Sequence, residues 1–174
     1  MSSLIDLYRR ARVSVKQLAG IEPVVPISPV KMVEFHGSAN SGWAIPRGRL
    51  SAASVIVDVG LGEDIGFTQS LMVRYGCQAH GFDPTPRAIA YVKALAVDGF
   101  VLHEVGVAAE RGPATFYLPN DESFVSGSIA QVEHLGQRRV EVELVTLRDV
   151  FQTVGTTSID LLKLDIEGAE YALI

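Results

Sequence analysis

A glycine-containing turn follows a β-branched run at 55–59 that is typical of a strand buried on both faces. Gly60 and Gly62 allow the backbone to turn tightly and to approach a ligand closely. About 20 residues further on, Asp83 ends a second short strand, where its carboxylate can accept both hydroxyl groups of an adenosine ribose. This spacing predicts a site for a ligand that contains adenosine. The structural alternatives are a tight turn without a ligand and a helix-capping role for Asp83.

The charge of the turn distinguishes two ligands that share this geometry, a dinucleotide and S-adenosylmethionine. Glu63 and Asp64 would repel a pyrophosphate bound among the amides of the turn. S-adenosylmethionine carries no phosphate, and Asp58 suits its ammonium group, directly or through a water molecule. The acids therefore favour S-adenosylmethionine over NAD. The residues expected to line the cofactor here are Asp58, Gly60, Gly62, Asp64 and Asp83.

Charged residues also occur in and after a strand expected at 159–166. Period-two alternation puts Lys163, Asp165 and Glu167 on one face, with the polar residues toward the carboxyl end. Charges in a central strand are costly unless they are paired or functional. In one interpretation, Asp165 or Glu167 is a general base toward an acceptor and Lys163 is its ion-pair partner. In the other, the residues form a structural pair and a cap for the next helix.

Other polar residues give weaker signals. Glu104 lies with His103 at the end of a third expected strand, near the place where an adenine would lie, so it is a further candidate for the cofactor site. The four histidines and the single Cys77 share no metal-ligand spacing, so we expect no metal site.

The elements that must position these residues alternate between strands and helices. Helices are expected at 67–75, 87–96 and 147–154, with a further helix from Ala169. Strands are expected at 55–59, 79–83, 100–108, 140–145 and 159–166. The segment 112–118 is expected to return as a hairpin against 100–108. This order predicts an α/β fold with a mainly parallel sheet, which binds ligands at the carboxyl ends of its strands.

Two parts are expected along the chain. Residues 1–50 are interpreted as an N-terminal amphipathic helix, at 3–19, followed by an extended connector with three prolines at 22–29. Residues 51–174 are interpreted as the cofactor-binding domain.

Composition restricts the classes of function. The chain has 174 residues, is 48% hydrophobic and carries a net charge of −5, which argues against a disordered tail and a basic nucleic-acid binder. No apolar run approaches the roughly 18–20 residues of a membrane span. The single cysteine fits a reducing compartment, and the N-terminus lacks the apolar stretch of a signal peptide. We therefore expect a cytoplasmic protein with a small-molecule acceptor and with neither nucleic acid nor membrane as a partner.

Several blocks, in order along the chain, resemble FkbM-type methyltransferases. The three signature blocks are Ile56-Val57-Asp58-Val59-Gly60 with Ile65-Gly66-Phe67, Gly81-Phe82-Asp83-Pro84-Thr85-Pro86, and Leu162-Lys163-Leu164-Asp165-Ile166-Glu167-Gly168-Ala169-Glu170. The intervening segments at 106–108, 114–117 and 145–150 are similar as well, and the resemblance covers roughly 42–174.

This resemblance implies a class I, Rossmann-like methyltransferase that uses S-adenosylmethionine and has helices on both faces of its sheet. Its usual acceptor is a hydroxyl oxygen of a sugar or natural product. The resemblance puts Asp58, Gly60, Gly62 and Asp83 at the cofactor, and Asp165 and Glu167 near the transferred methyl group. The alternatives are an NAD-dependent oxidoreductase and a cofactor-binding domain without turnover.

Three features depart from the family pattern. The turn at 60–66 is longer and more acidic than usual, and Asp83 stands where the family more often has Glu. The family also continues with further C-terminal strands that this chain lacks, so the strand at 159–166 is expected to have an open edge. Such an edge pairs with another chain or aggregates unless it is blocked, so we expect the chain either to form a homo-oligomer through this edge or to be markedly unstable.

Overall fold

The computed structural model describes residues 32–38, 41–118, 138–166 and 170–173. Contacts divide the chain into the units Met1–Lys31 and Met32–Ile174, and every element described below belongs to the second unit. The N-terminal helix and connector that the sequence predicts at 3–29 lie outside the described residues.

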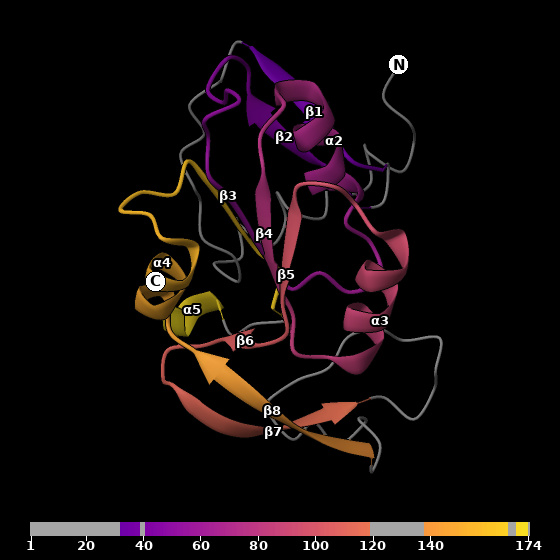
Figure 1. Cartoon of the computed structure of the whole chain (residues 1–174), viewed down its shortest axis with the longest axis vertical. Coiled ribbons are helices and arrows are strands. Elements are labelled where there is room, and N and C mark those ends of the chain that lie inside the picture. The colour runs from indigo at the N-terminus through magenta and orange to yellow at the C-terminus, as the bar shows by residue number, and fades with distance from the viewer. Residues whose placement is uncertain (1–31, 39–40, 119–137, 167–169, 174) are drawn as a thin grey trace, which may run out of the picture. The chain divides into compact units, whose positions relative to one another are not determined.

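Four strands form the central sheet, in the order β5-β4-β3-β9 (Figure 1). They are β3 (Ile56–Val59), β4 (Ala79–Phe82), β5 (Phe100–His103) and β9 (Leu161–Leu164). Each neighbouring pair in this order is parallel. The predicted α/β fold with a parallel sheet is confirmed, and among the described strands β9 lies at one edge of it.

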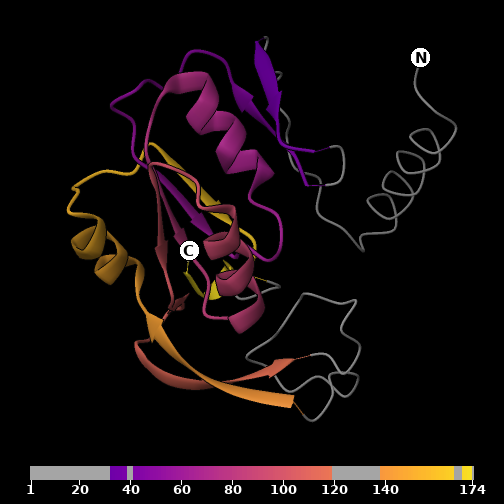
Figure 2. The ribbon, with the colours of Figure 1, turned by 45° about the vertical axis from the view of Figure 1, so that its right-hand side comes forward.

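Helices cover both faces of β3. They are α2 (Gly66–Tyr75), α3 (Pro86–Leu95), α4 (Leu147–Val154) and the short α5 (Glu170–Leu173). Ile56 packs with Phe67 and Leu71 of α2, whereas Val57 packs with Val150 of α4. Figures 1 and 2 show α4 across the central strands from α3. All four residues of β3 are therefore buried, as expected for a β-branched run. None of the helices that the structure describes is long and apolar enough to cross a membrane.

Local signals in the sequence set the helix ends. Thr146 and Asp149 form a capping box at the start of α4, in which each side chain accepts a hydrogen bond from the backbone of the other. Pro86 begins α3, where its fixed φ suits the first helical position. Gly76 ends α2 in the left-handed conformation.

A second sheet has the order β6-β8-β7. Its strands are β6 (Gly106–Val107), β7 (Gly112–Leu118) and β8 (Arg138–Val145). The predicted hairpin between 100–108 and 112–118 is wrong, because β7 pairs antiparallel with β8 along its whole length. The segment 100–108 divides into β5 and β6, so only the two residues of β6 reach this sheet, where they pair with β8. Figure 2 shows β7 and β8 as one long twisted ribbon.

The hairpin of β1 (Val33–His36) and β2 (Trp43–Pro46) was not expected, because both strands fall in the part at 1–50 that the sequence assigns to a helix and an extended connector. Ile45 joins the core that α2 covers, and His36 Nδ1 lies 2.9 Å from Ser70 Oγ on that helix. The outward-facing Val33 and Phe35 are exposed, so these short strands lack the apolar-in, polar-out alternation that identifies a strand.

Gly60 lies against β9 where β3 and β9 end. The N–H of Asp165 donates to the carbonyl of Val59 at 3.0 Å, which extends the pairing of the two strands. Gly60 has a φ of +80°, and a Cβ added to it would lie 2.0 Å from the carbonyl oxygen of Asp165. Glycine is therefore required here both by the backbone conformation and by the close approach of β9.

Gly60→Ala and Gly48→Ala separate these two requirements. Gly48 also has a positive φ, +73°, but no atom lies within 4 Å of its added Cβ. We expect Gly48→Ala to cost roughly 1–2 kcal/mol of stability through its backbone alone. Gly60→Ala should cost clearly more, because the backbone at Asp165 must move. Thermal melts of the two variants test this, and equal losses would contradict the close approach of β9 to Gly60.

Leu71 and Val73 test how α2 packs on the sheet. They are two residues apart on this helix, with exposures of 0% and 89%. Leu71→Ala should lower the free energy of unfolding by about 2–5 kcal/mol, because it leaves a cavity against β3. Val73→Ala, the matched control, should change it by less than about 0.5 kcal/mol. Urea denaturation measures both, and similar losses would show that α2 does not use the face described here.

Candidate functional site

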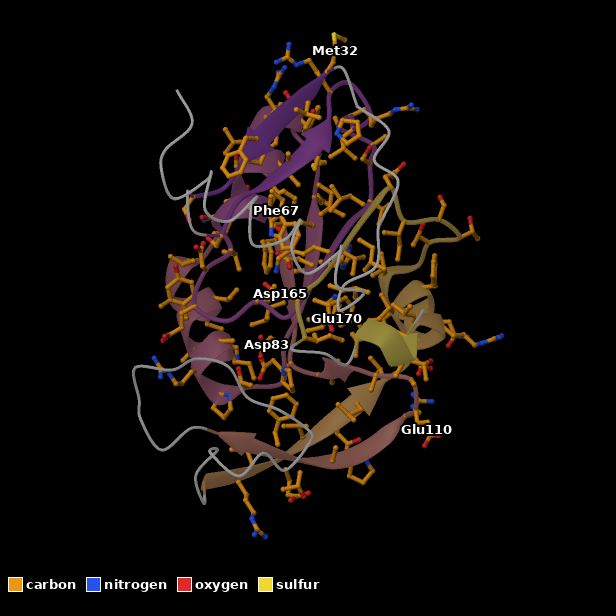
Figure 3. All side chains as sticks on the ribbon, turned by 180° about the vertical axis from the view of Figure 1, so that it is seen from behind. Met32, Phe67, Asp83, Glu110, Asp165 and Glu170 are labelled. Carbon is orange, nitrogen blue, oxygen red and sulfur yellow. The ribbon has the colours of Figure 1, made fainter. Side chains whose placement is uncertain are left out.

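The carboxyl ends of β3, β4 and β9 bring together the glycine turn, Asp83 and Asp165. The N–H of Gly60 donates to the carbonyl of Phe82 at 3.0 Å, and Gly60 also lies against the backbone of Asp165. Figure 3 shows Asp165 and Asp83 between the central strands and the β7–β8 ribbon. The three features that the sequence singled out thus meet at the edge where parallel α/β sheets bind ligands.

Asp83 is 5% exposed and ties the glycine turn to the start of α3. Its Oδ2 accepts the N–H groups of Leu61 at 2.9 Å and Gly62 at 3.1 Å. Its Oδ1 accepts the N–H of Thr85 at 2.8 Å and the hydroxyl of Thr85 at 2.6 Å. These four donors match the accepting capacity of a carboxylate. A ribose hydroxyl could bind Oδ1 only by displacing the hydroxyl of Thr85.

Asp58 is 1% exposed and forms an ion pair with Lys163. The two residues are direct neighbours across β3 and β9, and Lys163 Nζ lies 2.9 Å from Asp58 Oδ1. Lys163 also donates to the carbonyl of Gly60 at 3.1 Å, and the hydroxyl of Thr68 donates to Asp58 Oδ2. Burial raises the pKa of Asp58, whereas the Lys163 ammonium and the Thr68 hydroxyl oppose that rise. The carboxylate expected to meet the cofactor's ammonium group already binds a cation of the chain.

Asp165 is the exposed member of this charged group, with 57% of its side chain accessible. Its Oδ2 lies 3.8 Å from Lys163 Nζ, so the expected ion pair with Lys163 is present. Asp58 is nevertheless the closer partner of Lys163. Glu167, the other candidate base, lies outside the described residues.

The remaining acids of the turn are also engaged. Glu63 pairs with Arg87 at 2.5 Å. Asp64 accepts the N–H of Gly66 at 2.7 Å through Oδ1 and the hydroxyl of Ser41 through Oδ2, so it fixes the start of α2. The ion pair of Glu63 reduces the negative charge at the turn, so the repulsion of a pyrophosphate is weaker than the sequence alone indicates.

Glu104, the candidate near an adenine, pairs with Lys93 at 2.5 Å and is about half exposed. The neighbouring His103 stacks on Phe82, with ring centroids 4.3 Å apart, and its Nε2 lies 3.1 Å from His80 Nδ1. Burial lowers the pKa of both histidines. Within the described part of the chain, no three His, Cys, Asp or Glu side chains form a group that could hold a metal ion.

Sequence reasoning missed Thr68 and Thr85. Thr85 follows Asp83 by two residues, and that spacing is a local signal for a turn in which Asp binds the backbone ahead of it. Thr68 reaches Asp58 only because α2 lies over β3, and no local pattern reports this contact.

A groove of about 1130 Å³ lies elsewhere, beside α2. It is lined by the hairpin, by the outer face of α2 and by the turns at Gln78 and Gly99 that precede β4 and β5. Those turns lie at the amino ends of the strands, opposite to Asp83 and Asp165. The groove is therefore separate from the candidate site.

The chain is similar to a known protein family and to a curated protein. The methyltransferase FkbM domain family matches residues 58–174. The 2-O-methyltransferase NoeI of Sinorhizobium fredii is 30% identical over 135 residues, which cover 69% of this chain and 56% of NoeI. The chain thus spans about half the length of this curated relative. No solved structure is significantly similar to the chain. Since the family match takes in the whole segment from Asp58 through the glycine turn, Asp83 and Asp165, the chain belongs to the FkbM methyltransferase domain family.

Proposed function

We propose that this chain forms the cofactor-binding part of a class I, Rossmann-like methyltransferase that uses S-adenosylmethionine. The proposed acceptor is a hydroxyl oxygen of a sugar or a natural-product-like small molecule. The observation that carries this proposal is the family match over the segment whose turn and carboxylates meet at one edge of the sheet. The name of NoeI, a 2-O-methyltransferase, supports a hydroxyl acceptor.

The residues at this edge fit S-adenosylmethionine, which supplies a methyl group on a positively charged sulfur when it is bound. Asp83 offers a carboxylate for the ribose hydroxyls, next to the backbone of Gly60 and Gly62. Glu104, just beyond the end of β5, is the proposed neighbour of the adenine. Asp165, the exposed acid at this edge, suits a ligand with a cationic group.

The chemistry then depends mainly on positioning. Transfer of a methyl group is an in-line displacement, so holding the acceptor oxygen in line with the methyl carbon supplies most of the acceleration. With S-adenosylmethionine bound, the new O–C bond would form as the S–C bond breaks and a neutral thioether leaves. The acceptor's proton would pass to a carboxylate, Asp165 or Glu167, during or after the attack. We assign Lys163 a positioning role, because it binds Asp58 and the carbonyl of Gly60.

Two other functions are less well supported than a methyltransferase. An NAD-dependent oxidoreductase is not favoured, because the family that matches is one of methyltransferases. A cofactor-binding domain without turnover would retain S-adenosylmethionine and transfer no methyl group to any acceptor offered. Mass spectrometry of ligand that co-purifies with the protein, followed by assays with labelled S-adenosylmethionine and a panel of sugars, separates these functions.

S-adenosylhomocysteine should stabilise the chain more than NAD does at equal concentration. It shares the adenosine that Asp83 is proposed to bind, and it carries no pyrophosphate toward Glu63 and Asp64. Thermal-shift measurements and calorimetry test this, with adenosine as the reference ligand. A stronger effect of NAD would reverse the ranking of the two enzyme functions.

Asp83→Asn should lower the affinity for S-adenosylhomocysteine by roughly 10- to 150-fold, the factor expected when a charge-assisted hydrogen bond is lost. Thr85→Val is the matched variant, because it removes only the hydroxyl that occupies Asp83 Oδ1. It should leave the affinity unchanged or raise it, since the ribose no longer competes for that oxygen. Calorimetry measures both affinities. An Asp83→Asn variant that is folded and binds as the wild type does would contradict the ribose assignment.

A further inference from the structure

Lys163 lies between two carboxylates that differ sharply in accessibility. Its Nζ is 2.9 Å from Asp58 Oδ1 and 3.8 Å from Asp165 Oδ2. Asp58 is 1% exposed, whereas Asp165 is 57% exposed. Both carboxylates border the turn at Gly60, but only that of Asp165 is open to a ligand arriving from solvent.

Asp58 is closed to a second cation. One of its oxygens accepts from Lys163 and the other from the hydroxyl of Thr68. An ammonium group that approached Asp58 would have to enter a place that is almost closed to solvent, since Asp58 is 1% exposed, and it would then lie beside the Lys163 ammonium. Two like charges at that separation repel each other strongly inside a protein.

Asp165 is held in a fixed relation to the same turn. Its N–H donates to the carbonyl oxygen of Val59. Its own carbonyl oxygen would lie 2.0 Å from a Cβ added to Gly60. The backbone of Asp165 is thus packed against the turn while its carboxylate remains accessible. Lys163 approaches this carboxylate at one oxygen and from farther away than it approaches Asp58.

We infer that Asp165, and not Asp58, recognises the ammonium group at the methionine end of the cofactor, and that Lys163 keeps Asp58 from the ligand while holding the carbonyl of Gly60 in place. This inference rests on the proposed function. Asp58 and Lys163 are then positioning residues for the turn.

Two ligands distinguish the amino-acid end from the rest of the cofactor. S-adenosylhomocysteine carries the ammonium group, whereas 5′-methylthioadenosine shares the adenosine and the sulfur but lacks the amino acid. Asp165→Asn should lower the affinity for S-adenosylhomocysteine by roughly 10- to 150-fold. It should leave the affinity for 5′-methylthioadenosine unchanged. Asp58→Asn and Lys163→Met should lower the affinity for both ligands by similar factors, because they loosen the turn at which both ligands bind. They should also lower the melting temperature.

Glu110→Gln is the matched control for the loss of one negative charge, because Glu110 is exposed and lies outside the candidate site. It should change neither affinity. A preference for S-adenosylhomocysteine that falls in Asp58→Asn but persists in Asp165→Asn would overturn the inference while leaving the proposed function intact. Binding of neither ligand by the wild-type chain would instead overturn the proposed function, and the inference with it.

Discussion

The ion pair of Asp58 and Lys163 joins the two strands on which the site depends. It spans direct neighbours of β3 and β9, and it continues through Lys163 to the carbonyl of Gly60. The net contribution of such a pair to stability is small, because removing both charges from water costs about as much as their attraction returns, but removing one partner alone costs roughly 3–5 kcal/mol. Its value here is geometric: a slip of β9 by one residue would turn Lys163 away from Asp58 and leave the carboxylate buried without a cation.

The other acids around the turn also bind groups of the chain itself. Asp83 accepts from the turn and from Thr85, Asp64 accepts at the start of α2, and Glu63 pairs with Arg87. A carboxylate that accepts several backbone N–H groups orders a glycine-containing turn that would otherwise sample many conformations. The acidic character of this region therefore serves first to build the turn. Under the proposed function, recognition of the cofactor would fall to those groups that keep an accessible oxygen or that can exchange a donor.

The sequence predicts the parts of the fold that depend on local patterns. The β-branched run of β3, the helices α2 to α4 and the glycine turn followed by Asp83 all lie close to their expected places. Pairing between distant segments is a different matter. The predicted strand partner of β7 was wrong, because β7 pairs with β8. The closer ion-pair partner of Lys163 is Asp58, more than a hundred residues earlier in the chain. Both depend on strand order and register, which alternation of residue types within one strand does not specify.

The choice of cofactor likewise depends on contacts between distant segments as well as on the local sequence. Counting acids along the turn treats Glu63, Asp64 and Asp58 as three unpaired charges, but two of them lie in ion pairs with Arg87 and Lys163. The electrostatic argument against a pyrophosphate therefore loses much of its strength, and the family match carries the assignment to a methyltransferase. What the structure adds is the position of the remaining charge. An accessible Asp165 beside Gly60 favours a ligand whose cationic end lies at the turn, and a neutral or anionic group at that position would gain nothing from it.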